Sequence, residues 1–338
     1  MQADGVPPTV TLYQKLTATW VAQAISVVAK LGTADALADG PKGVDELAVA
    51  ANAHAPALYR ILRALASVGI FAEEEDGRFC LTPLAEPLRS DAPGSVRSFA
   101  IMLGEEWSWR PWGQLLQSVT TGQPAFEHTY GTGIFAYLAD RPDAGAIFDA
   151  AMTSRSGPDA DAVTAAYDFS AFRTVVDVGG GRGALLAAIL RTNPDVRGIL
   201  FDQAHVIPGA RQYLDAAGLG QRCELVAGDF FASVVAGGDT YVLKWIVHDW
   251  DDERALRILE RCHRAMPATG RLLLVETVIP PGNDPSSGKL ADLAMLVWTG
   301  GQERTEAEYR ALLAAAGFEL TKVVPTRSSL SVVEAVPR

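Results

Sequence analysis

The sequence predicts an α/β protein in which a doubly wound, mostly parallel sheet follows a smaller and mostly helical N-terminal domain. A β-branched run that ends in a glycine-rich turn begins at Val175, and further apolar runs alternate with helical patterns after it. Such alternation is typical of parallel sheets. A chain of 338 residues has room for two domains. We expect residues 1–98 to form the first domain, and residues 99–338 to form linker helices and the sheet domain.

Composition and charge exclude several classes of protein. About half of the residues are hydrophobic (49%) and 20% are charged, which permits a large core. The net charge of −11 disfavours nucleic acid or an anionic membrane as a partner. Neither a basic, apolar leader nor a long uncharged apolar run is present, so we expect no signal peptide and no membrane span. The cysteines, Cys80, Cys223 and Cys262, are too scattered for a disulfide framework or a zinc site, which fits the cytoplasm.

The N-terminal domain is predicted to begin with a helix from Leu12 to Leu31. A helix that is apolar on several sides needs more than one partner, either a second copy of this chain or other parts of its own chain. The positions that form its apolar stripe are Leu12, Leu16, Trp20, Ala24, Val27 and Leu31.

A helix, turn, helix and β-wing are predicted next, which is the pattern of a winged helix. Arg60 and Arg63 could reach a DNA groove, but the tip of the wing, residues 73–76, is Glu-Glu-Glu-Asp and repels phosphate. A packing or dimerisation role is therefore favoured over a DNA-binding regulator. The expected elements are helices at 44–51 and 58–68, a turn at 52–56, and strands at 69–73 and 78–81.

The stretch from Ser98 to Asp168 is predicted to be helical and is rich in aromatic residues. Most of these aromatic side chains are expected in the core. Rigid indoles and flexible methionines also suit planar ligands, so Trp107 and Met152 are candidates for a pocket wall.

The glycine turn identifies the expected cofactor. Glycines at 179, 181 and 183 follow Asp177, and the absence of Cβ atoms lets the backbone approach a ligand closely. A dinucleotide fingerprint places its glycines differently and binds a pyrophosphate. A carboxylate just before the glycines instead suits a cofactor with an ammonium group and no phosphate, which is S-adenosylmethionine. The alternative is a tight strand-to-helix turn without a ligand.

The strands after this turn place acids at one edge of the sheet, where open α/β sheets bind ligands. Asp202 follows the strand at 198–202 and lies where such folds grip ribose hydroxyls. The strand from Cys223 offers Asp229 to an adenine amino group and Phe230 to its face. Strands are also expected from Thr240 and at 271–276. Two closing runs, 318–325 and 330–336, allow an antiparallel hairpin, which is the methyltransferase variant of the Rossmann architecture.

His248 is the candidate general base, because it follows a sheet strand inside a charged cluster. A phenol needs a base at neutral pH, and neutral imidazole is suited to that task. Glu276 and Glu303 could fix its tautomer. The alternatives are a histidine at a helix entry, a solvated Glu276 at a strand end, and a Glu303 that pairs with Arg304 or begins a helix.

A divalent metal is the second chemical possibility, since Asp249, Asp251 and Asp252 lie close together in the sequence. Acids at the start of a helix are commonly N-caps, however. We therefore expect no metal.

Four motifs together resemble the plant caffeate-type and bacterial natural-product O-methyltransferases. They are VVDVGGGRG at 175–183, GDFF at 228–231, LKWIVHDWDD at 243–252 and GGQERT at 300–305. The resemblance covers essentially the whole chain. It implies methyl transfer from S-adenosylmethionine to a phenolic hydroxyl of a small aromatic, and a homodimer joined through the N-terminal domain. Some members of the family methylate nitrogen or perform hydroxylation instead.

The resemblance also assigns roles to residues. Catalysis is expected from His248, Glu276 and Glu303. The cofactor is expected to contact Met152, Ser156, Gly179, Gly181, Asp202, Gln203, Asp229, Phe230 and Lys244. The substrate wall is expected to contain Trp107, Met152, Asp292, Met295 and Trp298.

Overall fold

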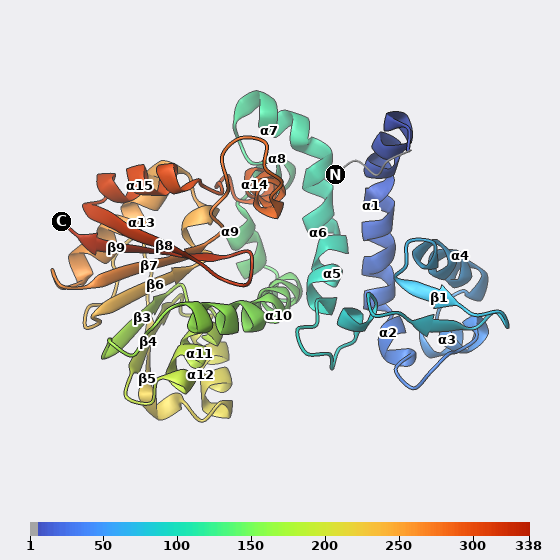
Figure 1. The fold of residues 1–338 in the computed structure, drawn as a ribbon, viewed down its shortest axis with the longest axis horizontal. Helices are drawn as coiled ribbons and strands as arrows, with labels where there is room; N and C mark the ends of the chain where they lie inside the picture. Colours follow the sequence, from blue (N-terminus) through green and yellow to red (C-terminus); the bar gives the residue numbers. More distant parts are fainter. Residues whose placement is uncertain (1–5) are drawn as a thin grey trace. The chain divides into compact units, whose positions relative to one another are not determined.

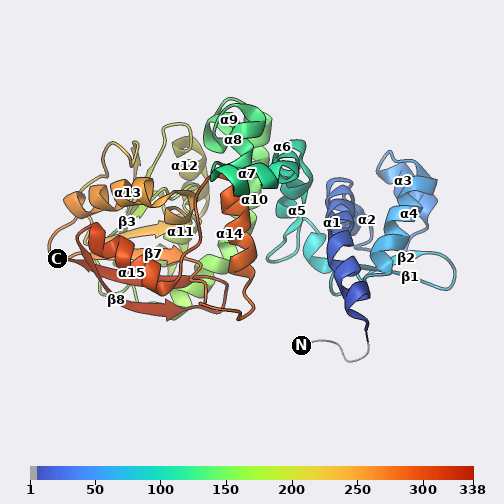
Figure 2. The ribbon, with the colours of Figure 1, turned by 90° about the horizontal axis from the view of Figure 1, so that it is seen from above.

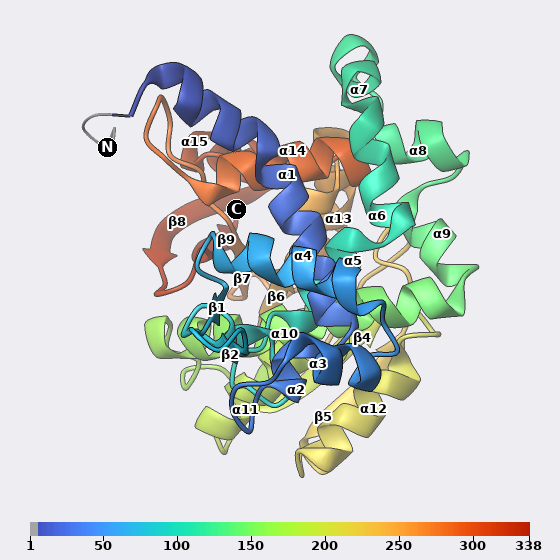
Figure 3. The same cartoon turned by 90° about the vertical axis from the view of Figure 1, so that its right-hand side faces the viewer.

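The computed structural model describes residues 6–338, so residues 1–5 of the expected first domain lie outside the described residues. The chain forms two compact units. The first contains the residues up to Arg110 together with Arg141–Arg155, and the second contains Pro111–Asp140 and Ser156–Arg338. The first border between these units lies between Arg110 and Pro111, which is later than the expected boundary between residues 98 and 99, because helix α5 (Arg97–Gly104) packs along α1 (Pro8–Lys30) in the first unit (Figure 3).

The first unit contains the predicted helix, turn, helix and wing. Phe71 pairs with Leu81 in an antiparallel ladder, so the predicted hairpin is confirmed. Its core is made by apolar side chains of the helices and the hairpin, among them Leu47, Leu62 and Phe79. After α1 its elements are α2 (Thr33–Ala36), α3 (Val44–Ala50), α4 (Ala55–Ala66), β1 (Phe71–Glu73), β2 (Phe79–Leu81), η1 (Glu86–Leu88), α5 and α6 (Glu106–Trp109).

Helix α1 is buried only near its C-terminal end, at Ser26, Val28 and Ala29. Four positions of its predicted stripe, Leu12, Leu16, Trp20 and Val27, are exposed, with Leu16 and Trp20 each 67% exposed, whereas Ala24 and Leu31 are half-buried against the core of this unit. Burial within the chain therefore does not account for the four exposed apolar residues.

The helices of the second unit that precede the sheet form an aromatic cluster. The rings of Phe126, Tyr130 and Tyr137 lie 4.8–5.3 Å apart, as expected for packed aromatic side chains. Helix α14 (Ser287–Trp298) packs beside this group in Figure 2. The preceding elements are η2 (Arg110–Gln114), α7 (Leu115–Thr121), α8 (Ala125–Tyr130) and α9 (Ile134–Ala139), and α10 (Pro142–Ala166) runs through both units.

The sheet of the second unit has seven strands in the order β5-β4-β3-β6-β7-β9-β8. Neighbours among β3 to β7 pair in parallel, and β9 pairs antiparallel with both β7 and β8. The predicted parallel sheet with an antiparallel hairpin is thus confirmed. Its strands are β3 (Thr174–Val178), β4 (Arg197–Asp202), β5 (Cys223–Ala227), β6 (Thr240–Lys244), β7 (Arg271–Glu276), β8 (Phe318–Pro325) and β9 (Ser331–Pro337).

Helices cover both faces of this sheet, as Figure 1 shows. Helices α13 (Asp252–Ala265) and α15 (Glu306–Ala315) pack on one face. The other face is covered by α10, α11 (Ala184–Thr192) and α12 (Ile207–Ala216). Alternate residues of each strand enter the two cores, which is the pattern of a strand buried on both faces. Among the described residues, no helix is long and apolar enough to cross a membrane.

Candidate active site

The turn after β3 requires glycine for two reasons. Gly179 and Gly181 have φ of 69° and 58°, which side chains rarely adopt. A Cβ atom at Gly179 would also lie 2.4 Å from Cδ1 of Ile246 and 3.6 Å from the ring of Phe230. The turn is held to the next strand, since Asp202 Oδ2 accepts a hydrogen bond from the Gly181 N–H at 2.8 Å. Gly179, Gly181, Asp202 and Phe230 are therefore brought together, as the sequence predicts.

Asp177 is buried beneath this turn. Burial raises the pKa of its carboxyl to about 7, Lys244 lowers it and Asp202 raises it further. Its Oδ2 atom has no hydrogen-bond partner among the described residues. A buried carboxylate without a partner for one oxygen is costly, so this end of the turn fits a ligand that carries positive charge.

Lys244 lies at the carboxyl end of β6 and donates a hydrogen bond to Ser156 Oγ at 3.0 Å. Its Nζ atom also lies 3.9 Å from the centre of the Trp245 ring. Trp245 has a φ of 55°, which is unusual for a residue with a large side chain. This conformation turns the chain sharply between the strand and His248.

The other two expected cofactor residues at this edge are more exposed. Asp229 Oδ1 accepts a hydrogen bond from the Phe231 N–H at 2.8 Å, which fixes the loop after β5. Gln203 follows Asp202, and its N–H donates to Asp202 Oδ1 at 2.6 Å.

His248 lies in the short helix η4 (Val247–Asp249) with a carboxylate near each ring nitrogen. Its Nδ1 atom is 3.0 Å from Glu303 Oε1 and 3.9 Å from Glu276 Oε2. Its Nε2 atom is 3.7 Å from Asp249 Oδ1. The two glutamates expected beside the histidine are therefore its neighbours in the structure.

Burial and charge change the pKa values of the groups in this cluster. Burial lowers the pKa of His248, but Glu276, Asp249 and Glu303 outweigh that effect and raise it to about 9. Burial raises the pKa of Glu276 to about 7 and that of Asp249 to about 6, while His248 lowers both. The cluster is thus a set of groups that compete for protons near neutral pH.

Glu276 is wholly buried, so it is not the solvated strand end that the sequence leaves open. Its Oε1 atom accepts hydrogen bonds from the N–H groups of Ile246 and Val247, at 3.1 and 2.8 Å. Glu276 therefore holds the loop that carries His248 as well as facing the imidazole.

Arg304 is a residue that sequence reasoning missed. Its side chain is 0% exposed and donates to the carbonyls of Val247 and Trp250 and to Asp252 Oδ1. Arg304 does not pair with Glu303, as one alternative proposed, because Glu303 faces His248. The arginine inside the GGQERT motif is the signal that could have drawn attention to it.

The segment before Arg304 approaches the histidine loop very closely. The Gln302 N–H donates to the His248 carbonyl at 2.9 Å. A Cβ atom at Gly301 would lie 2.0 Å from that carbonyl oxygen, so only glycine fits there.

The acids proposed for a metal site have other partners. Asp251 caps α13 by accepting from the Arg254 N–H at 2.8 Å. Asp252 accepts from Arg304 and from the amide of Gln302. These contacts favour structural roles for both acids, and only Asp249 faces the histidine.

The expected substrate residues lie in two parts of the chain. Asp292, Met295 and Trp298 belong to α14, and Asp292 Oδ1 accepts from the Glu303 N–H at 2.8 Å. Met295 and Trp298 are half-buried, and Trp298 meets Trp112 edge to face with 6.2 Å between ring centres. Trp107 is buried and Met152 half-buried in the first unit.

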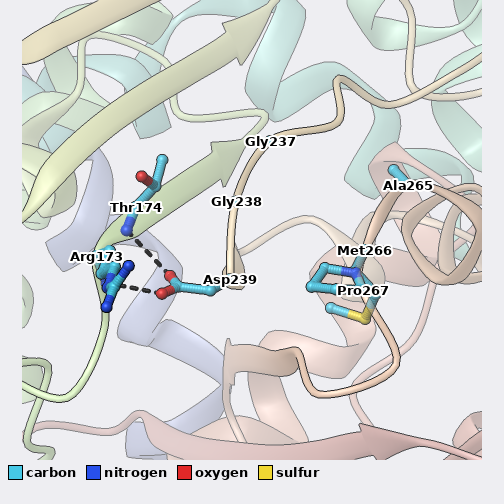
Figure 4. Close-up of a pocket in the computed structure, with 8 residues that line it drawn as sticks. All are labelled: Arg173, Thr174, Gly237, Gly238, Asp239, Ala265, Met266 and Pro267. Carbon is cyan, nitrogen blue, oxygen red and sulfur yellow. Dashed lines mark hydrogen bonds between the residues drawn. The ribbon is translucent and has the colours of Figure 1, made fainter.

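A separate pocket of about 550 Å³ opens at the amino ends of β3 and β6 (Figure 4). The carboxylate that lines it, Asp239, already accepts hydrogen bonds from the Arg173 and Thr174 N–H groups at 2.8 and 3.0 Å. The pocket lies at the edge opposite His248, so it is not the expected ligand edge. It is lined by Arg173, Thr174, Gly237, Gly238, Asp239, Ala265, Met266 and Pro267.

Two parts of the chain match described families. Residues 112–319 match the O-methyltransferase domain, and residues 13–91 match the O-methyltransferase dimerisation domain.

Three relatives illustrate the range of the family. Phenazine O-methyltransferase PhzM of Lysobacter antibioticus is 52% identical over 336 residues, which cover 99% of this chain and 98% of that protein. O-demethylpuromycin-O-methyltransferase of Streptomyces alboniger is 41% identical, with 93% and 85% covered. Phenazine-1-carboxylate N-methyltransferase of Pseudomonas aeruginosa is 33% identical, with 93% and 92% covered.

Solved structures agree with this assignment. The crystal structure of LaPhzM superposes with a TM-score of 0.94 at 52% identity, covering 98% of this chain and 100% of that one. The SAH-bound form of CalO1, a methyltransferase of calicheamicin biosynthesis, gives 0.86 at 38% identity and covers both chains fully. The chain therefore belongs to the family of S-adenosylmethionine-dependent O-methyltransferases that carry an N-terminal dimerisation domain.

Proposed function

We propose that the enzyme transfers a methyl group from S-adenosylmethionine to a phenolic hydroxyl of a small, planar aromatic molecule, with His248 as the general base. One observation carries this proposal: Nδ1 of His248 lies 3.0 Å from Glu303 and 3.9 Å from Glu276. A neutral imidazole that donates from Nδ1 to Glu303 has its lone pair on Nε2. Nε2 is then the atom that accepts the proton of the hydroxyl.

The cofactor supplies a methyl group that is already electrophilic, so the protein has to align the acceptor and remove its proton. Asp202 is proposed to accept from ribose hydroxyls, and Phe230 to pack against the adenine. The buried carboxylate of Asp177 favours a positive charge nearby, which a sulfonium and an ammonium group provide. Further proposed contacts are Met152, Ser156, Gly179, Gly181, Gln203, Asp229 and Lys244.

The acceptor is proposed to be a small molecule because the chain is strongly acidic, with a net charge of −11. Met295 and Trp298 are proposed to form a flat apolar wall, which selects planar rings. Trp107 and Met152 stay candidates for substrate contact from their residue types alone. The phenazine and puromycin O-methyltransferases among the relatives favour an aromatic natural product. Asp292 is proposed to line the substrate site beside Met295 and Trp298 and to hold the backbone of Glu303 by its hydrogen bond.

The test is a screen of phenols, anilines and aliphatic alcohols with labelled S-adenosylmethionine, followed by mass spectrometry. We expect label on the oxygen of a planar phenol. Label found only on nitrogen or only on aliphatic oxygen, or cofactor that binds without being consumed, would contradict the proposal.

N-methylation is the second candidate, because a relative at 33% identity is a phenazine-1-carboxylate N-methyltransferase. The same screen separates the two functions: anilines or ring nitrogens would carry the label, and replacement of His248 would have little effect if the nitrogen acceptor carries no proton to remove. A hydroxylating relative would release oxidised product without label.

A homodimer through the N-terminal domain is proposed from the exposed apolar face of α1 and from the match to a dimerisation domain. Light scattering at micromolar concentration is expected to give twice the 36.0 kDa mass of the chain. A monomer would contradict this, and specific retention of DNA would revive the regulator hypothesis. We also expect the enzyme to act in the cytoplasm.

A further inference from the structure

Three buried oxygen atoms, on the two glutamates that face His248 and on one tyrosine of the adjoining core, lack a hydrogen-bond partner among the described residues. They are Glu276 Oε2, Glu303 Oε2 and the hydroxyl of Tyr309. Tyr309 lies in α15, and the N-cap of that helix, Thr305, comes directly after Glu303 and Arg304 in the sequence. Tyr309 is 0% exposed. Buried polar groups are nearly always paired, because leaving one unpaired in the interior is unfavourable. Two acceptors and one donor in the same buried region are chemically complementary.

The surroundings of Tyr309 support this pairing. Tyr309 packs in the same core as Val247, the residue before His248. Burial raises the pKa of the Tyr309 phenol well above its usual value, and the charges of Glu276 and Glu303 raise it further. The phenol therefore stays protonated and can only donate towards these carboxylates.

We propose that Tyr309 is a positioning residue for the His248 base: its hydroxyl donates to one internal water, and that water donates to the outer oxygens of Glu276 and Glu303. This inference rests on the proposed role of His248. A donor to a carboxylate favours its charged form. Tyr309 thus keeps negative charge behind the imidazole, which strengthens the base and holds its tautomer.

The groups that face His248 come from several elements, and the test must separate Tyr309 from them. Asp249 lies on its own helix η4, Glu276 ends β7, and Glu303 lies in the loop before α15. Asp292 of α14 holds the Glu303 N–H. Arg304 and Glu308 act on Tyr309 itself.

The experiment measures the titration of His248 by NMR in the full-length enzyme labelled at histidine, with the resonance assigned by a His248→Gln variant. Tyr309→Phe keeps the ring and removes the hydroxyl. We expect the pKa of His248 to fall by about one unit, because less charge then faces the imidazolium. The kcat value should fall about threefold to tenfold at its plateau, with KM for the cofactor unchanged.

Tyr241→Phe is the matched control. Tyr241 is also 0% exposed, but its hydroxyl donates towards the carbonyls of Val235 and Ala265, at 3.0 Å each. This variant should lose stability without moving the His248 titration. An equal shift in both variants, or none in Tyr309→Phe, would overturn the inference, while the labelling screen would still decide the proposed function.

If Tyr309→Phe does not fold, 3-fluorotyrosine placed at position 309 keeps the shape and makes the phenol a stronger donor. The pKa of His248 should then rise. A titration identical to that of the unmodified enzyme would count against Tyr309 as a positioning residue.

Discussion

At the amino edge of the sheet, Asp239 gives both carboxylate oxygens to backbone N–H groups, those of Arg173 and Thr174. At the carboxyl edge, Glu276 gives one oxygen to the backbone and leaves the other beside His248. In Asp239 both oxygens accept hydrogen bonds from the backbone, which suits a structural role. In Glu276 one oxygen has no backbone donor and faces the imidazole of His248 instead. Asp239 and Glu276 both lie at the end of a strand, so their hydrogen bonds, and not their place in the sheet, distinguish the structural acid from the one beside the histidine.

Replacing His248, at the carboxyl edge of the sheet, should have the largest effect on the rate. His248→Ala should lower kcat by about 10²–10⁴-fold, the usual contribution of a positioned base. Binding of S-adenosylhomocysteine, measured by calorimetry, should stay nearly unchanged. The exposed His54 of the first unit supplies the control, His54→Gln, with unchanged kcat. Activity that survives in His248→Ala would show that the groups at the carboxyl edge, unlike those expected of an active site, are not needed for the reaction.

Asp202 extends the comparison to the cofactor. Asp202→Ala should weaken cofactor binding by about 10- to 150-fold, equivalent to about 1.5–3 kcal/mol for a charged acceptor. Calorimetry with S-adenosylhomocysteine measures this, and Asp195→Ala, at an exposed position before β4, should bind like the parent. Binding of NAD by the parent enzyme would contradict the assignment of this edge.

Replacing the carboxylate by an amide at Glu276 and at Asp239 tests whether the two acids have different roles. Glu276→Gln should lower kcat about tenfold, because it removes charge beside Nδ1. Asp239→Asn should leave kcat unchanged and lower the free energy of unfolding by about 1 kcal/mol, because the amide can accept from only one of the two N–H groups. Both are measured by steady-state kinetics and urea unfolding. Equal kinetic effects would show that hydrogen bonding does not separate the two acids.

The pH dependence follows from the raised pKa of His248, about 9. Below that value the imidazole holds a proton and cannot act as a base, so kcat/KM should rise as the pH increases from 7 towards 9. The measurement uses an acceptor phenol that titrates outside this range. A profile that is flat across it, or that falls as the pH rises, is the contrary result.

The smallest expected effect is that of metal removal. Excess EDTA should leave the rate unchanged, because Asp251 caps a helix and Asp252 binds Arg304. Loss of activity in EDTA that magnesium restores would assign a metal to the carboxyl edge.

Much of the fold follows from local patterns in the sequence. The β-branched run and glycines around Asp177 predict the first strand and its turn, and the acids after later strands predict the ligand edge. The pairing of the closing hairpin is also local, since Phe318–Pro325 and Ser331–Pro337 are close in sequence. The positions of His248 and Glu276 after predicted strands and of Glu303 in a later loop suggest their roles, the family resemblance strengthens them, and their contact is a finding of the structure.

Other features depend on contacts between distant residues and could not be predicted. The burial of Arg304 requires a partner at Asp252, which is 52 residues away. The burial of Tyr309 is equally hidden in the sequence, because it depends on a core shared with Leu272 and Leu274 of β7, which are more than 30 residues away. The residue type of Trp245 does not predict its positive φ, since tryptophan rarely adopts such a conformation.

The close approach of Gly301 to the His248 carbonyl matters for anyone who redesigns this enzyme by random mutagenesis. A library that varies Met295 and Trp298 on α14 explores side chains that are only half-buried and can change without moving the backbone. If the same library also varied position 301, most of its clones would carry a Cβ atom there that displaces the loop of His248. Selection for new acceptors should therefore keep the codon for Gly301 fixed and place its diversity on α14.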